Sequence, residues 1–135
     1  MGEQRKVRVL LADDESHVRL FIRTVINSMG CEVVAEAATG KEALELFDTT
    51  APDLVLLDIN MPVMDGLAAL KVLREKSEDV AIVMLTSLAS AEIVEQALEA
   101  GATYHLRKDL PLGELKEEIR EAWLTHAGDP EGDVG

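Results

Sequence analysis

The chain has 135 residues, of which 47% are hydrophobic and 3% aromatic, and it carries a formal net charge of −13 at pH 7. This length fits one domain, the apolar content excludes a disordered chain, and the acidity argues against binding nucleic acid or anionic lipid through charge. No apolar run approaches the roughly 20 residues of a membrane span, and a single cysteine points to a reducing cytoplasm, without membrane attachment.

Strand-like apolar runs alternate five times with segments of helical periodicity. The runs are almost continuous in Val, Leu and Ile, which is typical of parallel strands buried on both faces. Glu32 and Glu36 interrupt the second run, so that strand is expected at an edge of the sheet. In chain order, the predicted elements are strand 7–12, helix 15–29, strand 32–37, helix 41–48, strand 54–58, helix 66–75, strand 81–86, helix 90–100, strand 103–107 and helix 111–126.

This alternation predicts an α/β fold, a doubly wound five-stranded parallel sheet with five helices. Gly30 and Gly101 are placed to end two of the helices, and Pro52 prevents the second helix from continuing. The domain is expected to cover residues 5–126. Residues 127–135 contain Gly, Asp and Pro, and they are predicted to form a flexible tail or the start of a linker.

Five polar residues stand where four of the predicted strands end. Asp13 and Asp14 follow the first strand, Asp58 ends the third, Thr86 ends the fourth, and Lys108 follows the fifth. Ligands of open α/β sheets bind just outside the carboxyl ends of the strands. The sequence therefore predicts one site at this edge of the sheet.

The residue types at this edge suit phosphoryl transfer. Crowded carboxylates raise one another's pKa, and a hard divalent cation such as Mg²⁺ relieves that repulsion. Asp58 can act as a nucleophile toward phosphorus, while Lys108 and Thr86 can donate to phosphoryl oxygens. Each residue alone also has a plain structural explanation, and Glu15 is interpreted only as an acid in the first turn of a helix.

These motifs, in this order and spacing, resemble the receiver domain of two-component response regulators (CheY-like) from residue 7 to about 123. The resemblance implies a flavodoxin-like sheet with strand order 2-1-3-4-5. The segments that carry it are Leu10-Leu11-Ala12-Asp13-Asp14-Glu15, Pro52-Asp53-Leu54-Val55-Leu56-Leu57-Asp58, Met61-Pro62, Asp65-Gly66, Leu85-Thr86-Ser87, and Gly101-Ala102 ahead of Lys108.

The resemblance also implies roles for the residues. Asp58 would accept a phosphoryl group from a histidine kinase, a phosphotransfer protein or a small phosphodonor. Asp14, Asp58 and the backbone carbonyl of Asn60 would bind Mg²⁺ directly, and Asp13 would bind it mainly through water. Lys108 would bind the phosphoryl group.

The switch implied by the resemblance involves Thr86 and His105. Thr86 would move toward the phosphoryl group and His105 would swing inward behind it. These movements would remodel the face made by the fourth helix, fifth strand and fifth helix, which could control a downstream protein or output domain, or support a homodimer. Such a domain catalyses only its own phosphorylation and dephosphorylation, and does not itself bind nucleic acid.

Three positions depart from the family pattern. His105 stands where the family usually has Tyr or Phe, and the neighbouring Tyr104 is expected to point to the other face of the sheet. Asp109 replaces a common proline after Lys108, so a trans peptide bond is expected there. Leu88 lies near the predicted path of attacking water, and its bulk is predicted to slow dephosphorylation.

Two other classes of protein fit this sequence less well. Phosphatases of the haloacid dehalogenase type place two acids as Asp-x-Asp, whereas Asn60 follows Asp58 at that spacing. A pseudo-receiver that binds partners without phosphorylation would have no use for the crowded acids. The chain is interpreted either as a complete single-domain regulator, which Met1 favours slightly, or as a receiver cut from a longer protein.

Overall fold

The computed structural model describes residues 6–87 and 91–127. The strands are β1 (Arg8–Ala12), β2 (Glu32–Ala37), β3 (Leu54–Asp58), β4 (Ala81–Thr86) and β5 (Tyr104–Arg107). The helices are α1 (Ser16–Ser28), α2 (Gly40–Thr50), α3 (Gly66–Lys76), α4 (Ala91–Glu99) and α5 (Leu112–Ala127). All strands are parallel in the order β2-β1-β3-β4-β5, which confirms the predicted topology and places β2 at an edge.

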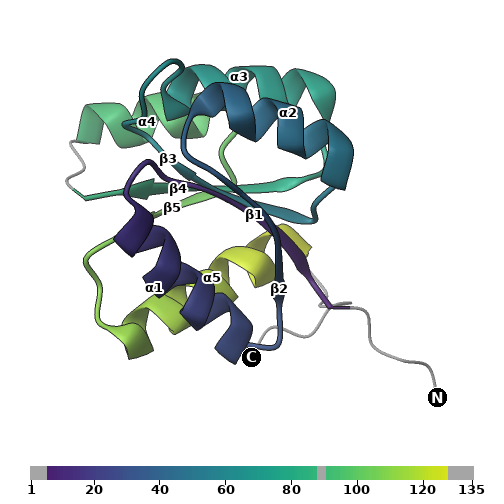
Figure 1. Ribbon diagram of the computed structural model, residues 1–135. Helices are drawn as coiled ribbons and strands as arrows, with labels where there is room; N and C mark the ends of the chain where they lie inside the picture. Colours follow the sequence, from purple (N-terminus) through teal and green to yellow (C-terminus); the bar gives the residue numbers. More distant parts are fainter. Residues whose placement is uncertain (1–5, 88–90, 128–135) are drawn as a thin grey trace.

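The sheet separates two helical layers, with α1 and α5 on one face and α2, α3 and α4 on the other (Figure 1). Alternate residues of each strand enter opposite layers, because side chains alternate across a pleated sheet. In β3, Leu54 and Leu56 pack toward α1 and α5, whereas Val55 and Leu57 pack toward α2 and α3. β3 and β4 are buried along their whole length, as continuous apolar runs predict.

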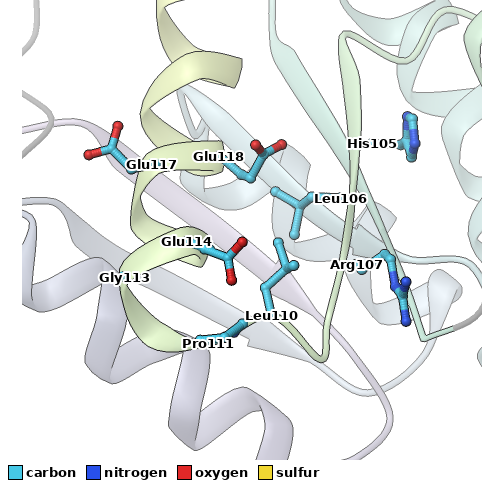
Figure 2. A pocket seen from close by; sticks show the side chains of 9 residues that line it. All are labelled: His105, Leu106, Arg107, Leu110, Pro111, Gly113, Glu114, Glu117 and Glu118. Atoms are coloured by element: carbon cyan, nitrogen blue, oxygen red, sulfur yellow. The ribbon is translucent and has the colours of Figure 1, made fainter.

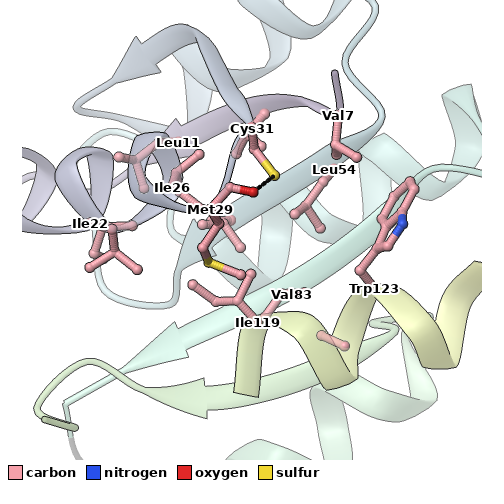
Figure 3. Packing of buried hydrophobic residues seen from close by; sticks show 14 of the residues in the cluster. Val7, Leu11, Ile22, Ile26, Met29, Cys31, Leu54, Val83, Ile119 and Trp123 are labelled. Carbon is pink, nitrogen blue, oxygen red and sulfur yellow. Dashed lines mark hydrogen bonds between the residues drawn. The ribbon is translucent and has the colours of Figure 1, made fainter. Parts of the chain in front are cut away.

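The layer containing α1 and α5 is closely packed with aliphatic side chains (Figure 3). Ile22 and Ile26 of α1 and Ile119 of α5 are buried against the sheet. Cys31 lies in the same cluster, where its thiol donates a weak hydrogen bond to the carbonyl oxygen of Met29 at 4.0 Å. This core is built almost entirely from Leu, Ile, Val, Met and Ala, as the low aromatic content implies.

Most element boundaries shift by one or two residues from those predicted. α2 continues to Thr50, because the chain leaves the helix only at Ala51, whose backbone is left-handed at φ 48°. Thr103 precedes β5, and its hydroxyl accepts a hydrogen bond from the Ile82 amide at 3.1 Å. Ala127 is still helical, although the tail was predicted to begin there. The rest of the predicted tail lies outside the described residues, as does the start of helix 90–100.

Arg74 of α3 holds the starts of β4 and β5 together. Its guanidinium donates to the carbonyl oxygens of Gly101 and Val80, both at 2.7 Å, and to the Thr103 hydroxyl at 3.2 Å. Gly101 follows the end of α4 and has φ +108°, a conformation that glycine adopts without strain.

Among residues 6–87 and 91–127, the structure contains no helix that combines the length and the apolar character of a membrane span.

Candidate functional site

The predicted site residues converge at the carboxyl edge of the sheet. Ala12 of β1 pairs with Leu57 of β3, so Asp13 and Asp58 follow in adjacent strands. Carboxylate oxygens of Asp13, Asp14 and Asp58 all lie within 4.8 Å of one another. The parallel register therefore creates the acidic cluster that the sequence predicted.

Burial distinguishes this edge from the rest of the described molecule. Among residues 6–87 and 91–127, the buried polar or charged residues are Asp13, Asp58 and Thr86, and all three lie here. Asp14 is exposed, and Lys108 nearby has a side chain only 8% exposed. Buried charges are unfavourable unless they are paired or bind a ligand, so this concentration marks a functional edge.

Lys108 is the cation that holds the acids together. Its Nζ lies 2.9 Å from Asp13 Oδ2, 3.1 Å from Glu15 Oε1 and 3.4 Å from Asp58 Oδ2. Burial alone lowers the pKa of Lys108, but hydrogen bonds to Asp13 and Glu15 and the charge of Asp58 outweigh it, so the pKa is raised. The side chain is therefore a firmly protonated ammonium group.

Asp13 and Asp58 differ in how well their charges are compensated. Asp13 Oδ1 also accepts the Glu15 amide at 2.9 Å, so both of its oxygens have short partners. Asp58 has longer contacts, with the Asn60 amide at 3.3 Å and Lys108 at 3.4 Å. Burial, followed by the charge of Asp13, raises the pKa of Asp58 to about 6 despite these contacts. A further cation near this carboxylate would stabilise the ionised form of Asp58.

The acidic cluster fits a hard divalent cation. Its oxygen-only donor set of three carboxylates is the type that Mg²⁺ and Ca²⁺ prefer. The raised pKa of Asp58 shows that Lys108 does not fully compensate the buried charge. Asn60 follows Asp58 closely and is exposed, so its backbone lies beside the cluster.

Glu15 takes a position that the sequence did not predict. It is the N-cap residue of α1, one residue before the helix, and its side chain makes no cap hydrogen bond. Instead the carboxylate binds Lys108, which lowers the pKa of Glu15. The sequence pattern assigned Lys108 to the phosphoryl group and did not predict its contacts to Asp13 and Glu15. The only signal for these contacts was their adjacency in the Asp13-Asp14-Glu15 run.

Thr86 and Lys108 are connected through the backbone. The Lys108 amide donates to the Thr86 carbonyl oxygen at 2.9 Å, which joins the end of β4 to the residue after β5. His105 pairs with Met84 in register and is half-buried. Tyr104 packs against the core on the α1 and α5 side, as predicted, and its hydroxyl donates to Glu118 at 2.9 Å. The rings of Tyr104 and His105 still lie near each other, with centroids 6.4 Å apart.

The loop after Asp58 is fixed by Gly66 at the start of α3. A Cβ at Gly66 would lie 2.0 Å from the Asp58 carbonyl oxygen, so only glycine allows this approach. Asp65 caps α3 by accepting the Ala68 amide at 2.8 Å. The Asp65-Gly66 motif thus positions the end of β3.

The peptide bonds of the described residues are trans, including the one after Lys108, as predicted. Leu88 lies outside the described residues.

Comparisons with known proteins agree with this geometry. The response regulator receiver domain family matches residues 9–120. Chemotaxis protein CheY of Bacillus subtilis is 35% identical over 114 residues, which cover 84% of this chain and 95% of that protein. The uncharacterized transcriptional regulatory protein YhcZ of the same organism is 40% identical over 124 residues, covering 91% of this chain but only 56% of YhcZ.

Solved structures share the fold closely. The signal receiver domain of the putative response regulator NarL from Mycobacterium tuberculosis has a TM-score of 0.81 at 32% identity, covering 87% of this chain and 95% of that one. A CheX–CheY–BeF3–Mg²⁺ complex from Borrelia burgdorferi also gives a TM-score of 0.81, at 27% identity, covering 84% of this chain and 87% of that one.

Some relatives are longer than this chain, which spans about half the length of YhcZ. The match to the family nevertheless covers all five strands apart from Arg8, the first four helices, the first half of α5 and the residues of the acidic edge. Receiver domains are phosphoacceptor switches of two-component signalling rather than conventional enzymes. This chain belongs to the response regulator receiver domain family.

Proposed function

We propose that Asp58 is the phosphoacceptor of this receiver. The observation that carries the proposal is the burial of Asp13, Asp58 and Thr86 around Lys108. With a pKa of about 6, Asp58 is mostly ionised at neutral pH and is therefore available as a nucleophile. One of its carboxylate oxygens attacks the donor's phosphorus, and the new O–P bond forms as the donor's bond to phosphorus breaks.

Lys108 and Thr86 stabilise the transferred group in this proposal. Lys108 already reaches Asp58 and can donate to a phosphoryl oxygen bound there. The Thr86 hydroxyl, at the end of the neighbouring strand, is a second donor. A backbone hydrogen bond already joins the two residues before the phosphoryl group arrives, and positioned charge is a main source of phosphoryl-transfer catalysis.

Mg²⁺ is the cation we infer for the acidic cluster. Asp14, Asp58 and the Asn60 carbonyl would hold it directly, and Asp13 would contribute through water. When bound, it supplies charge neutralisation for the crowded carboxylates and phosphoryl oxygens. The related CheY structure that contains BeF3 and Mg²⁺ supports this choice.

The switch would pass from the phosphorylated edge into β5. Phosphorylation adds a charge of about −2 and strong acceptor oxygens. Lys108 follows β5 directly, and its amide is bonded to Thr86, so both residues couple the site to that strand. His105 lies on β5 where family members place the aromatic switch residue, and we assign it that role. The phosphodonor would be a histidine kinase or phosphotransfer protein, and the altered face of α4, β5 and α5 would act on a partner or output domain.

Intact mass after incubation with acetyl phosphate and Mg²⁺ tests the assignment. Wild type should gain one phosphoryl group and lose this gain when a chelator is added, whereas Asp58→Ala should gain none. Asp48→Ala is the matched control, because Asp48 is an exposed acid away from the cluster. No adduct on folded wild type would instead favour an interaction module that works without phosphorylation.

A further inference from the structure

A pocket of about 450 Å³ lies at the amino ends of β3 and β4, away from the carboxyl edge that holds Asp58. Pro52 and Asp53 line it just before β3, Val80 lines it just before β4, and the ends of α2, α3 and α5 complete the wall. The larger groove between β5 and α5 (Figure 2) belongs to the face already assigned to a partner. The pocket at the amino ends takes no part in phosphoryl transfer, and its volume suits a small molecule.

Trp123 supplies this pocket with an unused hydrogen-bond donor. The residue is 7% exposed, and its indole nitrogen is the buried side-chain nitrogen or oxygen that lacks a hydrogen-bond partner among residues 6–87 and 91–127. Figure 3 shows this nitrogen on the side of the ring turned away from Leu54. Buried donors are nearly always paired, because an unpaired donor forfeits its hydrogen bond to water. The indole N–H would therefore favour a ligand that carries an acceptor.

The pocket wall is apolar and held in place. Phe47 of α2 is half-buried, and Pro52 and Val80 are buried. Arg74 fixes the chain before β4, because its guanidinium donates to the carbonyl oxygens of Ser77 at 3.2 Å and Val80 at 2.7 Å. A wall that is already ordered reduces the conformational entropy lost when a ligand binds.

His126 lies beside Trp123 in the wall, with ring centroids 5.6 Å apart. Burial, followed by the charge of Arg74, lowers the pKa of His126 from its ordinary value of 6.5, so the imidazole is neutral at pH 7. The side chain is only half-buried, so it can turn and let an acceptor reach the indole nitrogen.

Carboxylates outnumber cations around the pocket. Asp48 and Lys76 pair with each other at 2.9 Å, so their charges cancel. Asp53 and Asp79 also line the pocket, and the charge of nearby Arg74 offsets part of the charge of Asp79. The remaining negative charge disfavours an anionic ligand.

We propose that this pocket binds a small, uncharged, planar molecule with a carbonyl acceptor, an aromatic amide in chemical class. Its carbonyl oxygen would accept a hydrogen bond from the Trp123 indole N–H, and its ring would lie against the apolar wall. The surrounding carboxylates would exclude the corresponding acid, although that acid has the same shape. The inference goes beyond the proposed function and does not depend on Asp58, which lies at the other end of the strands.

NMR titration tests the proposal directly. The chain has one tryptophan, so its indole N–H gives one resonance in a nitrogen–proton correlation spectrum. Nicotinamide should move this resonance of the wild type downfield to saturation, because the N–H gains an acceptor. Nicotinate, with the same ring but a negative charge, should bind about tenfold more weakly. No saturable shift with nicotinamide, or equal binding of nicotinate, overturns the proposal.

Two variants locate the site. Trp123→Phe keeps an aromatic ring but removes the N–H, so nicotinamide should bind about tenfold more weakly, as followed through the Val80 amide resonance. Asp79→Asn removes an exposed charge and should narrow the difference between nicotinamide and nicotinate about threefold. If Trp123→Phe folds and binds nicotinamide as wild type does, the proposal is wrong. If that variant does not fold, an unaltered difference in Asp79→Asn has the same consequence.

Glu92→Gln is the matched control, because it removes an equal charge from an exposed position on α4 that does not line the pocket. It should leave both affinities unchanged. A change equal to that of Asp79→Asn would show that net charge, rather than the pocket, sets the preference, and would overturn the proposal. Phosphorylation is judged separately by mass, so a wild type that gains a phosphoryl group but shows no indole shift overturns only the pocket.

Discussion

The carboxyl edge of the sheet and the surface between α2 and α3 each carry a Lys–Asp ion pair of the same length. Lys108 Nζ lies 2.9 Å from Asp13, and Lys76 Nζ lies 2.9 Å from Asp48. The side chains of the first pair are 8% and 0% exposed, whereas those of the second are 33% and 56% exposed. Equal distances therefore describe two energetically different contacts.

The difference lies in what happens when one partner is removed. Water screens and solvates the charges of an exposed pair, so such pairs contribute about 0–1 kcal/mol. A buried pair gains little net stability, but removing one member leaves an uncompensated charge at a cost of about 3–5 kcal/mol. The buried carboxylates at the sheet edge are therefore stable only while a cation is bound to them. Such dependence on a neighbouring charge suits a switch that is controlled by a ligand.

The largest expected effect comes from Lys108→Met. This variant should lose about 3 kcal/mol of unfolding free energy at pH 7 in chelator, because Asp13 and Asp58 lose their shared cation. Added Mg²⁺ should restore part of the loss. Lys76→Met, the matched control, should lose less than about 1 kcal/mol. Urea unfolding measures both, and equal losses would show that burial does not distinguish the two pairs.

A smaller effect is expected from Asp58→Asn, and it depends on pH. The pKa of Asp58 is raised from 3.8 to about 6 in the folded protein. Between about pH 4 and 6 the folded state therefore holds more protons than the unfolded state, so stability falls as pH rises. The variant removes this ionisation and should exceed wild type by about 2–3 kcal/mol at pH 7.

Urea unfolding of wild type and Asp58→Asn at several pH values, in chelator, checks the sign. The difference in unfolding free energy should be near zero at pH 4 and should grow until it levels off above pH 6. A difference that does not change with pH would mean that folding does not raise the pKa of Asp58.

The fold was predictable because the strands are apolar along their length. A run such as Leu54-Val55-Leu56-Leu57 can be stable only between two layers, and alternation with helices then requires a parallel sheet. The site was predictable for the same reason, since Asp13 and Asp58 end adjacent parallel strands. Topology alone brought these residues together, before any side-chain detail was known.

The remaining features depend on side-chain reach, which spacing in the sequence does not specify. The Arg74 guanidinium donates to the Gly101 carbonyl oxygen, and the Lys108 ammonium lies closer to Asp13 and Glu15 than to Asp58. Long flexible side chains have many rotamers, and the surrounding packing decides among them.

The smallest predicted effect concerns Glu15, the exposed member of the cluster around Lys108. An ammonium group has three donors, and here Asp13, Glu15 and Asp58 occupy its reach. A phosphoryl group on Asp58 needs one of those donors. Glu15 is exposed, so its side chain can give way more easily than those of the buried acids. Removing its contact should raise the rate of phosphorylation by acetyl phosphate about threefold.

Two substitutions separate competition for Lys108 from simple charge repulsion. Glu15→Gln removes the charge, whereas Glu15→Asp keeps the charge but is one methylene too short to hold the same contact to Lys108. If the contact restrains Lys108, both variants should be phosphorylated faster than wild type in a mass-based time course. If only Glu15→Gln is faster, the carboxylate merely repels the anionic donor. That result would assign the restraint on Lys108 to the buried acids alone, and would confine the switch to groups within the sheet edge.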